Sequence, residues 1–340
     1  METTPKVTIR NLCCFSELSI TLPERASCVG GWTVLFGDNG VGKTTALRAI
    51  ALACLDPAMA TAVLAQMRNQ TGVPMLRRST MTGEVLLQLP NGRLRVHLRS
   101  GEDYESVVSV EDGYPRPQLY AYGCSRGSVL GGPNRSLTLG PLADVNTLFE
   151  ERQGLIHGET WLKNRKLAAL EHPGGRAPQI YDTICAVLQQ LLPGVTSVDV
   201  RDDHAWVRGP AIGEAPIGAL SDGYRSTAGW VLDLLARYME RARQRGWSLA
   251  TDFPTRMEGL VLVDEVDQHL HPRWQARILA DLRRVFPRLS FIVTTHNPMT
   301  LLSANDGDVV GMRRDENGGI EATSINIPHG LLIEQVRPGQ

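Results

Sequence analysis

Residues 34–50 read VLFGDNGVGKTTALRAI. The stretch opens with three apolar residues, as a buried strand does, and closes in an alanine-rich pattern with the spacing of a buried helix face. Between them lies G-x-x-x-x-G-K-[ST], in the strand-to-helix context that a phosphate-binding loop requires. We therefore expect a nucleoside triphosphate to contact nine consecutive residues: Gly37, Asp38, Asn39, Gly40, Val41, Gly42, Lys43, Thr44 and Thr45.

Each residue type in this loop has a physical task. Glycine allows positive φ, so successive backbone N–H groups can point at phosphate oxygens. The N-terminus of the following helix adds partial positive charge. Lys43 would reach the β- and γ-phosphates, and the Thr44 hydroxyl would occupy one ligand position on Mg²⁺.

Two further strand patterns end in residues suited to the same chemistry. Residues 259–263 are continuously apolar and end in Asp264 and Glu265, as expected of a strand buried on both faces. Asp264 would hold Mg²⁺, and Glu265 would be the base that orients the attacking water. Residues 291–295 precede His296, whose imidazole could reach a γ-phosphate. The expected catalytic residues are thus Lys43, Glu265 and His296.

Residues 220–226 read LSDGYRS and precede an apolar helix pattern that includes Trp230 and Leu234. Two interpretations of Ser221 remain open. In one, its side chain only caps the free N–H groups of the helix. In the other, this helix N-terminus grips a γ-phosphate that is bound on another subunit.

Composition excludes several classes of protein. A net charge of −1 over 340 residues gives no global attraction to nucleic acid or to anionic membranes. No apolar run approaches eighteen residues, and METTPKVTIR at the N-terminus lacks the features of a signal peptide. The cysteines show no metal-binding spacing and are expected to be reduced thiols in the cytoplasm: Cys13, Cys14, Cys28, Cys54, Cys124 and Cys185.

The chain is expected to form one α/β domain with insertions. Strands at 6–36 lead into the loop, and alternating apolar residues at 85–98 flank Asn91-Gly92, a strong hairpin signal. Helix patterns fill 144–192, and no heptad run predicts a long coiled coil. We expect a nucleotide-binding core at 1–55 and 255–340, a β subdomain at 83–125 and a helical subdomain with LSDGYRS at 141–250.

Together these motifs resemble the ATP-binding-cassette superfamily of P-loop NTPases. The loop at 37–45 is similar to its Walker A, LSDGYRS to its signature, LVLVDE at 260–265 to its Walker B, and His296 to its switch histidine. DEVDQHLHP and TTHNP resemble the soluble branch that includes structural-maintenance-of-chromosomes (SMC), RecF and overcoming-lysogenization-defect proteins. LYAYGCSRG and LFEE…WLK are similar to small stand-alone bacterial ATPases described as ATP-binding proteins involved in virulence, whose relatives often sit in anti-phage defence operons.

The resemblance implies ATP and Mg²⁺ as cofactors and a homodimer that sandwiches two ATP molecules. Each site would then combine the loop, Asp264, Glu265 and His296 of one chain with Ser221 and Gly223 of the other. The chain departs from the transporter pattern at Asp222, where a glycine is usual, and at His271, where an aspartate is usual. Arg126 is the candidate phosphate contact near the lid position, and base stacking is open between Arg10 and Phe15.

Three functions follow from this resemblance. The first is a soluble ATPase whose ATP-driven dimer senses or clamps DNA, or controls a nuclease or toxin partner from the same operon. Only 44 residues follow His296, too few for the nuclease domain of overcoming-lysogenization-defect proteins, which favours a separate effector. The second is a RecF-like repair ATPase, with three arginine groups as possible DNA contacts: Arg93, Arg95, Arg99; Arg241, Arg243, Arg245; and Arg283, Arg284, Arg288. The third, a transporter subunit, is disfavoured by the HLHP ending.

Overall fold

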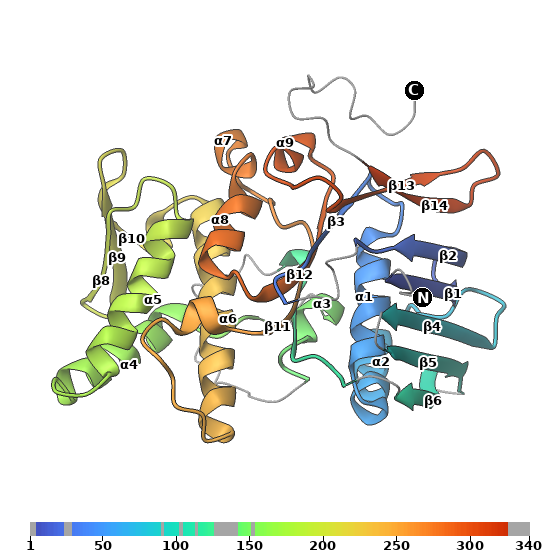
Figure 1. Ribbon diagram of the computed structural model, residues 1–340, viewed down its shortest axis with the longest axis horizontal. Helices are drawn as coiled ribbons and strands as arrows, with labels where there is room; N and C mark the ends of the chain where they lie inside the picture. Colours follow the sequence, from blue (N-terminus) through green and yellow to red (C-terminus); the bar gives the residue numbers. More distant parts are fainter. Residues whose placement is uncertain are drawn as a thin grey trace.

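The computed structural model describes residues 5–23, 29–89, 92–101, 105–112, 115–125, 142–150 and 154–325. A six-stranded sheet forms the middle of the molecule. In Figure 1, α1 (Lys43–Cys54) lies on one face of this sheet, and α5 (Ala177–Leu191), α6 (Asp222–Gln244) and α8 (Ile278–Val285) lie on the other. A second, antiparallel sheet lies on the far side of α1. Two apolar cores fill the spaces on the two faces of the central sheet.

The central sheet is parallel except at one edge. Five neighbouring strands run in the same direction, and the last strand pairs antiparallel with its neighbour. Its order across the sheet is β14 (Ile320–Ile325), β13 (Val309–Arg314), β3 (Trp32–Phe36), β12 (Leu289–Thr295), β11 (Gly259–Val263) and β7 (Leu119–Tyr122).

Burial on both faces explains why the inner strands are continuously apolar. All five residues of β3 are buried; Trp32, Val34 and Phe36 join one core, whereas Leu35 joins the core that contains α1. The predicted strands at 34–36, 259–263 and 291–295 are therefore confirmed as the middle of the sheet. Trp32 also stacks on Phe291 of β12, with ring centroids 4.4 Å apart.

Two consecutive helices follow the phosphate-binding loop. The first, α1 (Lys43–Cys54), ends before Asp56, because Pro57 cannot continue the backbone hydrogen bonds of the helix. The second, α2 (Pro57–Thr71), was not predicted, because proline is typical both of the position after a helix and of the first turn of a helix. Asp56 accepts a hydrogen bond from the backbone N–H of Met59 at 3.0 Å, so Asp-Pro here caps and begins a new helix.

The antiparallel sheet combines the predicted hairpin with the N-terminal strands. Val7 pairs with Leu87 across its middle, a contact between residues 80 positions apart that no local pattern predicts. Strands β1 and β2, expected in the nucleotide-binding core, thus belong to this sheet, whereas β7, expected in the β subdomain, belongs to the central one. The strand order in the antiparallel sheet is β2 (Phe15–Thr21), β1 (Lys6–Leu12), β4 (Thr82–Leu89), β5 (Gly92–Ser100) and β6 (Glu105–Asp112).

Most of the remaining elements cover the other face of the central sheet, whereas α3 (Asn146–Phe149) packs on the same side as α1 and α2. Helices α3, α4 and α5 confirm the helices predicted within 144–192, and α6, the longest helix among the described residues, has 23 residues. A small antiparallel sheet, β10–β9–β8, interrupts this helical region and was not predicted. Among the described residues, no helix is long and apolar enough to cross a membrane. The helices are α3 (Asn146–Phe149), α4 (Gly158–Glu171), α5 (Ala177–Leu191), α6 (Asp222–Gln244), α7 (Pro272–Gln275), α8 (Ile278–Val285) and α9 (Pro298–Leu301), and the strands are β8 (Ser197–Arg201), β9 (His204–Gly209) and β10 (Gly213–Pro216).

Candidate functional site

Three segments from distant parts of the sequence meet at the carboxyl edge of the central sheet. The phosphate-binding loop follows β3, Asp264 and Glu265 follow β11, and His296 follows β12. Because β12 lies between β3 and β11, the three segments are neighbours (Figure 1). This edge is where ligands bind in open parallel sheets.

Glycine is required at specific points of the loop. Gly40 and Gly42 have φ of +82° and +88°, in the left-handed region that other residues rarely adopt. A Cβ on Gly37 would lie 2.3 Å from the carbonyl oxygen of Met312 in β13. A Cβ on Gly42 would lie 2.5 Å from the ring of Phe15. Phe15 is 1% exposed and packs beneath the loop, so its ring face is not available to stack on a base.

Lys43 lies at the centre of the loop. Its side chain is 5% exposed, and its ammonium donates hydrogen bonds to the carbonyl oxygens of Gly37 at 2.8 Å and Asp38 at 3.0 Å. The same nitrogen is 3.8 Å from a carboxylate oxygen of Glu265. An ammonium carries three donors, so this cation can serve the loop and an anion beside Glu265 together.

Thr44 and Asp264 bring oxygen ligands together across the sheet edge. The Thr44 hydroxyl donates to Asp264 Oδ2 at 2.8 Å, although the residues are 220 positions apart. Hydroxyl and carboxylate oxygens are ligands that suit Mg²⁺, which binds proteins through one or two carboxylates and usually keeps several waters. The donor set therefore fits one magnesium ion that also contacts phosphate.

One hydroxyl that the sequence interpretation missed holds both acids. Thr294 Oγ1 donates to Asp264 Oδ1 at 2.6 Å and accepts the backbone N–H of Glu265 at 2.8 Å. Glu265 adopts φ of +48°, an uncommon conformation that places its side chain at the end of β11. Glu265 Oε2 then lies 2.6 Å from His296 Nδ1.

A second, buried carboxylate joins the segment after β11 to the segment after β12. Asp267 is 3% exposed and accepts hydrogen bonds from the hydroxyls of Thr295 at 2.9 Å and Thr300 at 2.6 Å. Thr295 also accepts the backbone N–H of Asn297. In the sequence, the contact between Asp267 and Thr295 is signalled only by the two threonines before His296, and this doublet alone does not predict which residue they contact.

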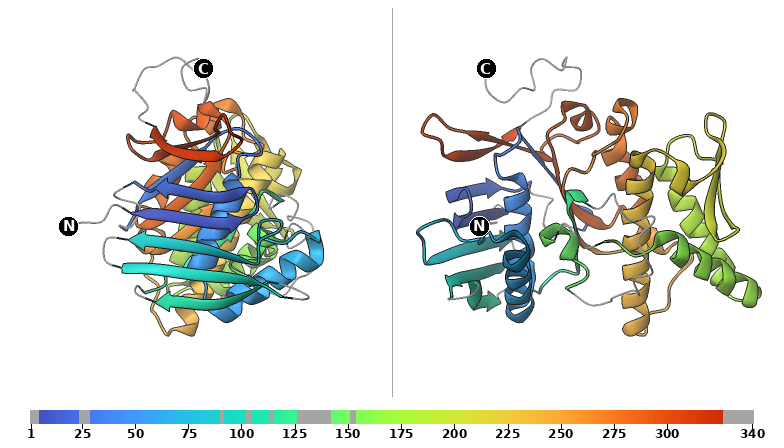
Figure 2. Two further views of the ribbon diagram at one scale, coloured as in Figure 1. Left: turned by 90° about the vertical axis from the view of Figure 1, so that its right-hand side faces the viewer. Right: turned by 180° about the vertical axis from the view of Figure 1, so that it is seen from behind.

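Ser221 and Gly223 begin α6 and lie across the sheet from the loop. Ser221 occupies the N-cap position of α6, but its hydroxyl makes no capping hydrogen bond. A Cβ on Gly223 would lie 2.5 Å from the carbonyl oxygen of His269, so this glycine permits close backbone packing. Both α1 and α6 begin toward the upper side of the molecule, on opposite faces of the sheet (Figures 1 and 2). The sheet therefore separates Ser221 from Lys43 within one chain.

Asp222, the departure from the usual signature, is paired within its own helix. Its carboxylate accepts a hydrogen bond from Arg225 one turn later, and this contact lowers the pKa of Asp222. The extra negative charge near the expected phosphate site is thus countered by an adjacent guanidinium. Arg10, the other candidate for base stacking, is ion-paired with Glu17 and Glu84. Arg126, the candidate phosphate contact near the lid position, lies outside the described residues.

Most of the arginines considered as DNA contacts are committed to carboxylates of the same chain. Such ion pairs satisfy the guanidinium locally and leave less charge for phosphate. Arg283 also lies over the ring of Trp32, at 4.9 Å from its centroid. The pairs are Arg95–Glu84, Arg241–Asp144, Arg243–Glu240, Arg283–Asp308, Arg284–Asp281 and Arg288–Glu258.

Comparison with known proteins agrees with this architecture. Residues 173–303 match a family model described as "AAA domain, putative AbiEii toxin, Type IV TA system", and residues 6–62 match a second AAA domain model. The head of an SMC protein bound to the C-winged helix domain of ScpA has a TM-score of 0.52 and 14% identity, covering 95% of this chain and 97% of that one. An SMC head with an extended coiled coil, bound to the C-terminal domain of ScpA derived from Pyrococcus furiosus, has a TM-score of 0.53 and 13% identity, covering 94% and 96%.

Similar sequences are named for two bacterial systems. The Septu protein PtuA of Bacillus mycoides is 24% identical over 92% of this chain, and the chain spans only 40% of that relative's length. The Retron Vc95 probable ATPase of Vibrio cholerae is 41% identical over 16% of this chain and 11% of its own length. In fold the chain is similar to SMC heads, and in sequence it matches AAA domain models and is similar to Septu PtuA and the retron ATPases.

Proposed function

We propose that this chain is a Mg²⁺-dependent ATPase that works as an ATP-sandwiched homodimer and controls a partner effector in bacterial anti-phage defence. The observation that carries the proposal is the meeting of Lys43 and Thr44 with Asp264 and Glu265 at one sheet edge. A glycine-rich loop, a buried ammonium, a hydroxyl–carboxylate pair and a second carboxylate are the parts that phosphoryl transfer requires.

Within one chain, the proposed catalytic residues act by position and charge. Loop N–H groups and Lys43 bind the triphosphate, and Thr44 and Asp264 hold Mg²⁺, which neutralises charge on the phosphates when bound. Glu265 orients the attacking water. His296, 2.6 Å from Glu265, positions that carboxylate and reaches the γ-phosphate side of the site.

The homodimer supplies the part of the site that one chain lacks. Ser221 and Gly223 begin a long helix on the same side of the molecule as the loop, with the sheet between them. A two-fold pairing through that side would set the α6 N-terminus of each chain against the γ-phosphate of the other. The unused Ser221 hydroxyl is then available as a phosphate donor.

The proposed output is control of a nuclease or toxin in the cytoplasm, rather than direct chemistry on DNA by this chain. Similarity to Septu PtuA and the retron ATPases supports a defence role. The ion pairing of six candidate DNA-contacting arginines supports a protein effector over direct DNA clamping.

Glu265→Gln tests the ATPase and the dimer together. We expect this variant to bind ATP as the unmodified chain does, to lose at least about 100-fold in hydrolysis, and to double its mass in solution with ATP and Mg²⁺. Lys43→Ala is the matched control, expected to lose ATP binding and to keep the smaller mass. If Glu265→Gln hydrolyses ATP at the normal rate, Glu265 does not orient the attacking water.

A second candidate, a RecF-like DNA-repair ATPase, is favoured by one observation. Arg93 and Arg99 are exposed on the face of β5 opposite the core. If this face binds DNA, log Kd should change steeply with log salt, and Arg93→Ala with Arg99→Ala should reduce the slope by about two. Arg284→Ala, on helix α8 and away from β5, is the control and should leave the slope unchanged.

A further inference from the structure

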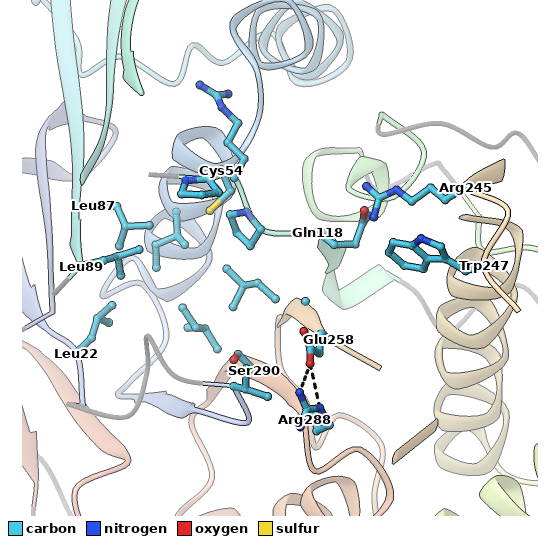
Figure 3. Close-up of a pocket in the computed structure, with 18 residues that line it drawn as sticks. Leu22, Cys54, Leu87, Leu89, Gln118, Arg245, Trp247, Glu258, Arg288 and Ser290 are labelled. Atoms are coloured by element: carbon cyan, nitrogen blue, oxygen red, sulfur yellow. Dashed lines mark hydrogen bonds and ion pairs between the residues drawn. The ribbon is translucent and has the colours of Figure 1, made fainter. Parts of the chain in front are cut away.

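A pocket of about 420 Å³ lies at the end of the central sheet opposite the candidate nucleotide site. It adjoins Gly259 and Ser290, at the beginnings of β11 and β12. Figure 3 shows an apolar wall that includes Leu87 and Leu89 from β4, and Trp247 with Arg245 on the facing side. One wall of the pocket is therefore apolar, and the facing wall carries an aromatic ring and a cation.

Arg245 is one of three arginines that line this pocket, with Arg116 and Arg288. Its guanidinium carbon lies 4.8 Å from the centroid of the Trp247 ring, and within the described part of the chain it has no carboxylate partner. The neighbouring Arg288 is instead paired with Glu258, as the dashed lines in Figure 3 mark. A stacked, unneutralised guanidinium beside an indole favours a planar ligand that carries negative charge.

A buried hydroxyl points to the same kind of ligand. A smaller cavity of about 240 Å³ adjoins the pocket and shares Gln118, Arg245, Trp247 and Glu258 with it. Tyr120 lines this cavity; its hydroxyl is buried and, among the described residues, has no hydrogen-bond partner. Burial raises the pKa of Tyr120, so the hydroxyl stays protonated and can donate. Leaving such a donor unsatisfied is costly, and a polar ligand group would satisfy it.

We propose that this pocket binds a planar aromatic anion of about the size of a nucleoside monophosphate. The leucine wall and the indole contact the faces of the ring system, and Arg245 pairs with the anionic group. Tyr120 and Gln118 hydrogen-bond the polar edge. A fatty acid anion fits less well, because two aromatic side chains and an amide converge where an alkyl chain would lie.

The pocket is separate from the proposed triphosphate site but touches the same elements at their other ends. Helix α1 begins at the phosphate-binding loop and ends at Cys54, which lines the pocket. Helix α6 begins next to Ser221 and ends next to Arg245. A ligand here would contact both helix ends without contacting Lys43 or Asp264.

Titration with AMP in the Lys43→Ala background tests this proposal, because the loop site is disabled there. We expect saturable binding of one AMP per chain by calorimetry, with ribose 5-phosphate and decanoate at least about tenfold weaker. Arg245→Ala and Trp247→Ala should each weaken AMP binding by roughly tenfold or more. A second titration uses the unmodified chain saturated with ADP and Mg²⁺, so the outcome does not depend on how Lys43→Ala folds.

Arg243→Ala is the matched control, because Arg243 lies in the same helical turn, pairs with Glu240 and does not line the pocket. It should bind AMP as the parent does. The chosen side chains at the α6 end are exposed, so thermal midpoints should stay unchanged. No saturable AMP binding in either titration, binding that Arg245→Ala and Trp247→Ala leave intact, or tighter binding of decanoate than of AMP would each overturn the proposal. Failure to bind ATP at the loop would instead count only against the proposed function.

Discussion

At the scale of single residues, Thr294 positions both acids of the candidate site. One hydroxyl donates to Asp264 and accepts from the backbone of Glu265, so it fixes the acid assigned to the metal and the acid assigned to water together. Partners of this kind set the orientation of metal ligands and are costly to remove.

We therefore predict that Thr294→Val lowers the ATPase rate by roughly 10- to 100-fold while ATP still binds. The valine keeps the shape of threonine and loses both hydrogen bonds, which leaves the Glu265 N–H and an Asp264 oxygen without this partner. Thr294→Ser, which restores the hydroxyl, should recover most of the rate in the same steady-state assay. An unchanged rate in Thr294→Val would show that neither acid depends on this contact.

Residues that directly follow a strand could be located from the sequence. The loop, Asp264, Glu265 and His296 follow strands directly, so a short motif fixes their place. Thr294 and Asp267 escaped notice because their partners come from other strands, and pairing across a sheet is not written in a local pattern. Phe15 shows the converse: an aromatic residue near the loop proved to be core.

At the scale of elements, a buried ionic network attaches α6 to the central sheet. Asp233 accepts hydrogen bonds from Tyr122 of β7 at 3.0 Å and from Arg237 of α6 at 2.5 Å. Arg237 also contacts Asp144 at 3.2 Å, and Arg241 pairs with the same carboxylate. The network ties α6, the helix that begins in the LSDGYRS segment, to β7 at the edge of the central sheet.

Arg237→Leu should destabilise the chain by about 3–5 kcal/mol, because two carboxylates would remain buried without their shared cation. Burial already raises the pKa of Asp144 despite Arg237 and Arg241, and loss of Arg237 removes an influence that lowers it. A carboxyl with a raised pKa in the folded state binds protons more readily folded than unfolded, so its stability contribution falls as pH rises through that range. The loss in Arg237→Leu should thus be smaller at pH 5 than at pH 8.

Denaturant unfolding at the two pH values measures this prediction. Arg243→Leu, at an exposed pair on the same helix, is the control and should change stability by less than about 0.5 kcal/mol. Equal stability of Arg237→Leu and the parent would mean that the network does not hold α6 in place.

Elements were predicted best where one local signal decides them. The loop-to-α1 junction and the β4–β5 hairpin carry such signals and are confirmed. Helix α2 was missed because proline both ends and begins helices, and Asp56 decides which. The membership of β7, β1 and β2 in their sheets follows from contacts between distant residues, such as Tyr122 with Val263, so sequence order misassigned their subdomains.

At the scale of the whole molecule, the residues of the proposed composite site lie in two separate places on one side of the chain. The phosphate-binding loop and the α6 N-terminus lie toward the same side, separated by the central sheet (Figure 2). One chain therefore cannot close Ser221 over its own Lys43, whereas a two-fold related copy can supply it. The proposed dimer follows from this separation.

The most direct test mixes two inactive variants, Lys43→Ala and Ser221→Arg, in equal amounts and measures ATP hydrolysis per chain. In a mixed dimer, one composite site carries both substitutions and the other carries neither. Random pairing therefore sets an upper limit of about a quarter of the unmodified rate, and we expect a clear recovery of activity below that limit, whereas each variant alone stays inactive. With the fold of both variants verified by thermal unfolding, a mixture as inactive as its components would contradict a site shared between two chains.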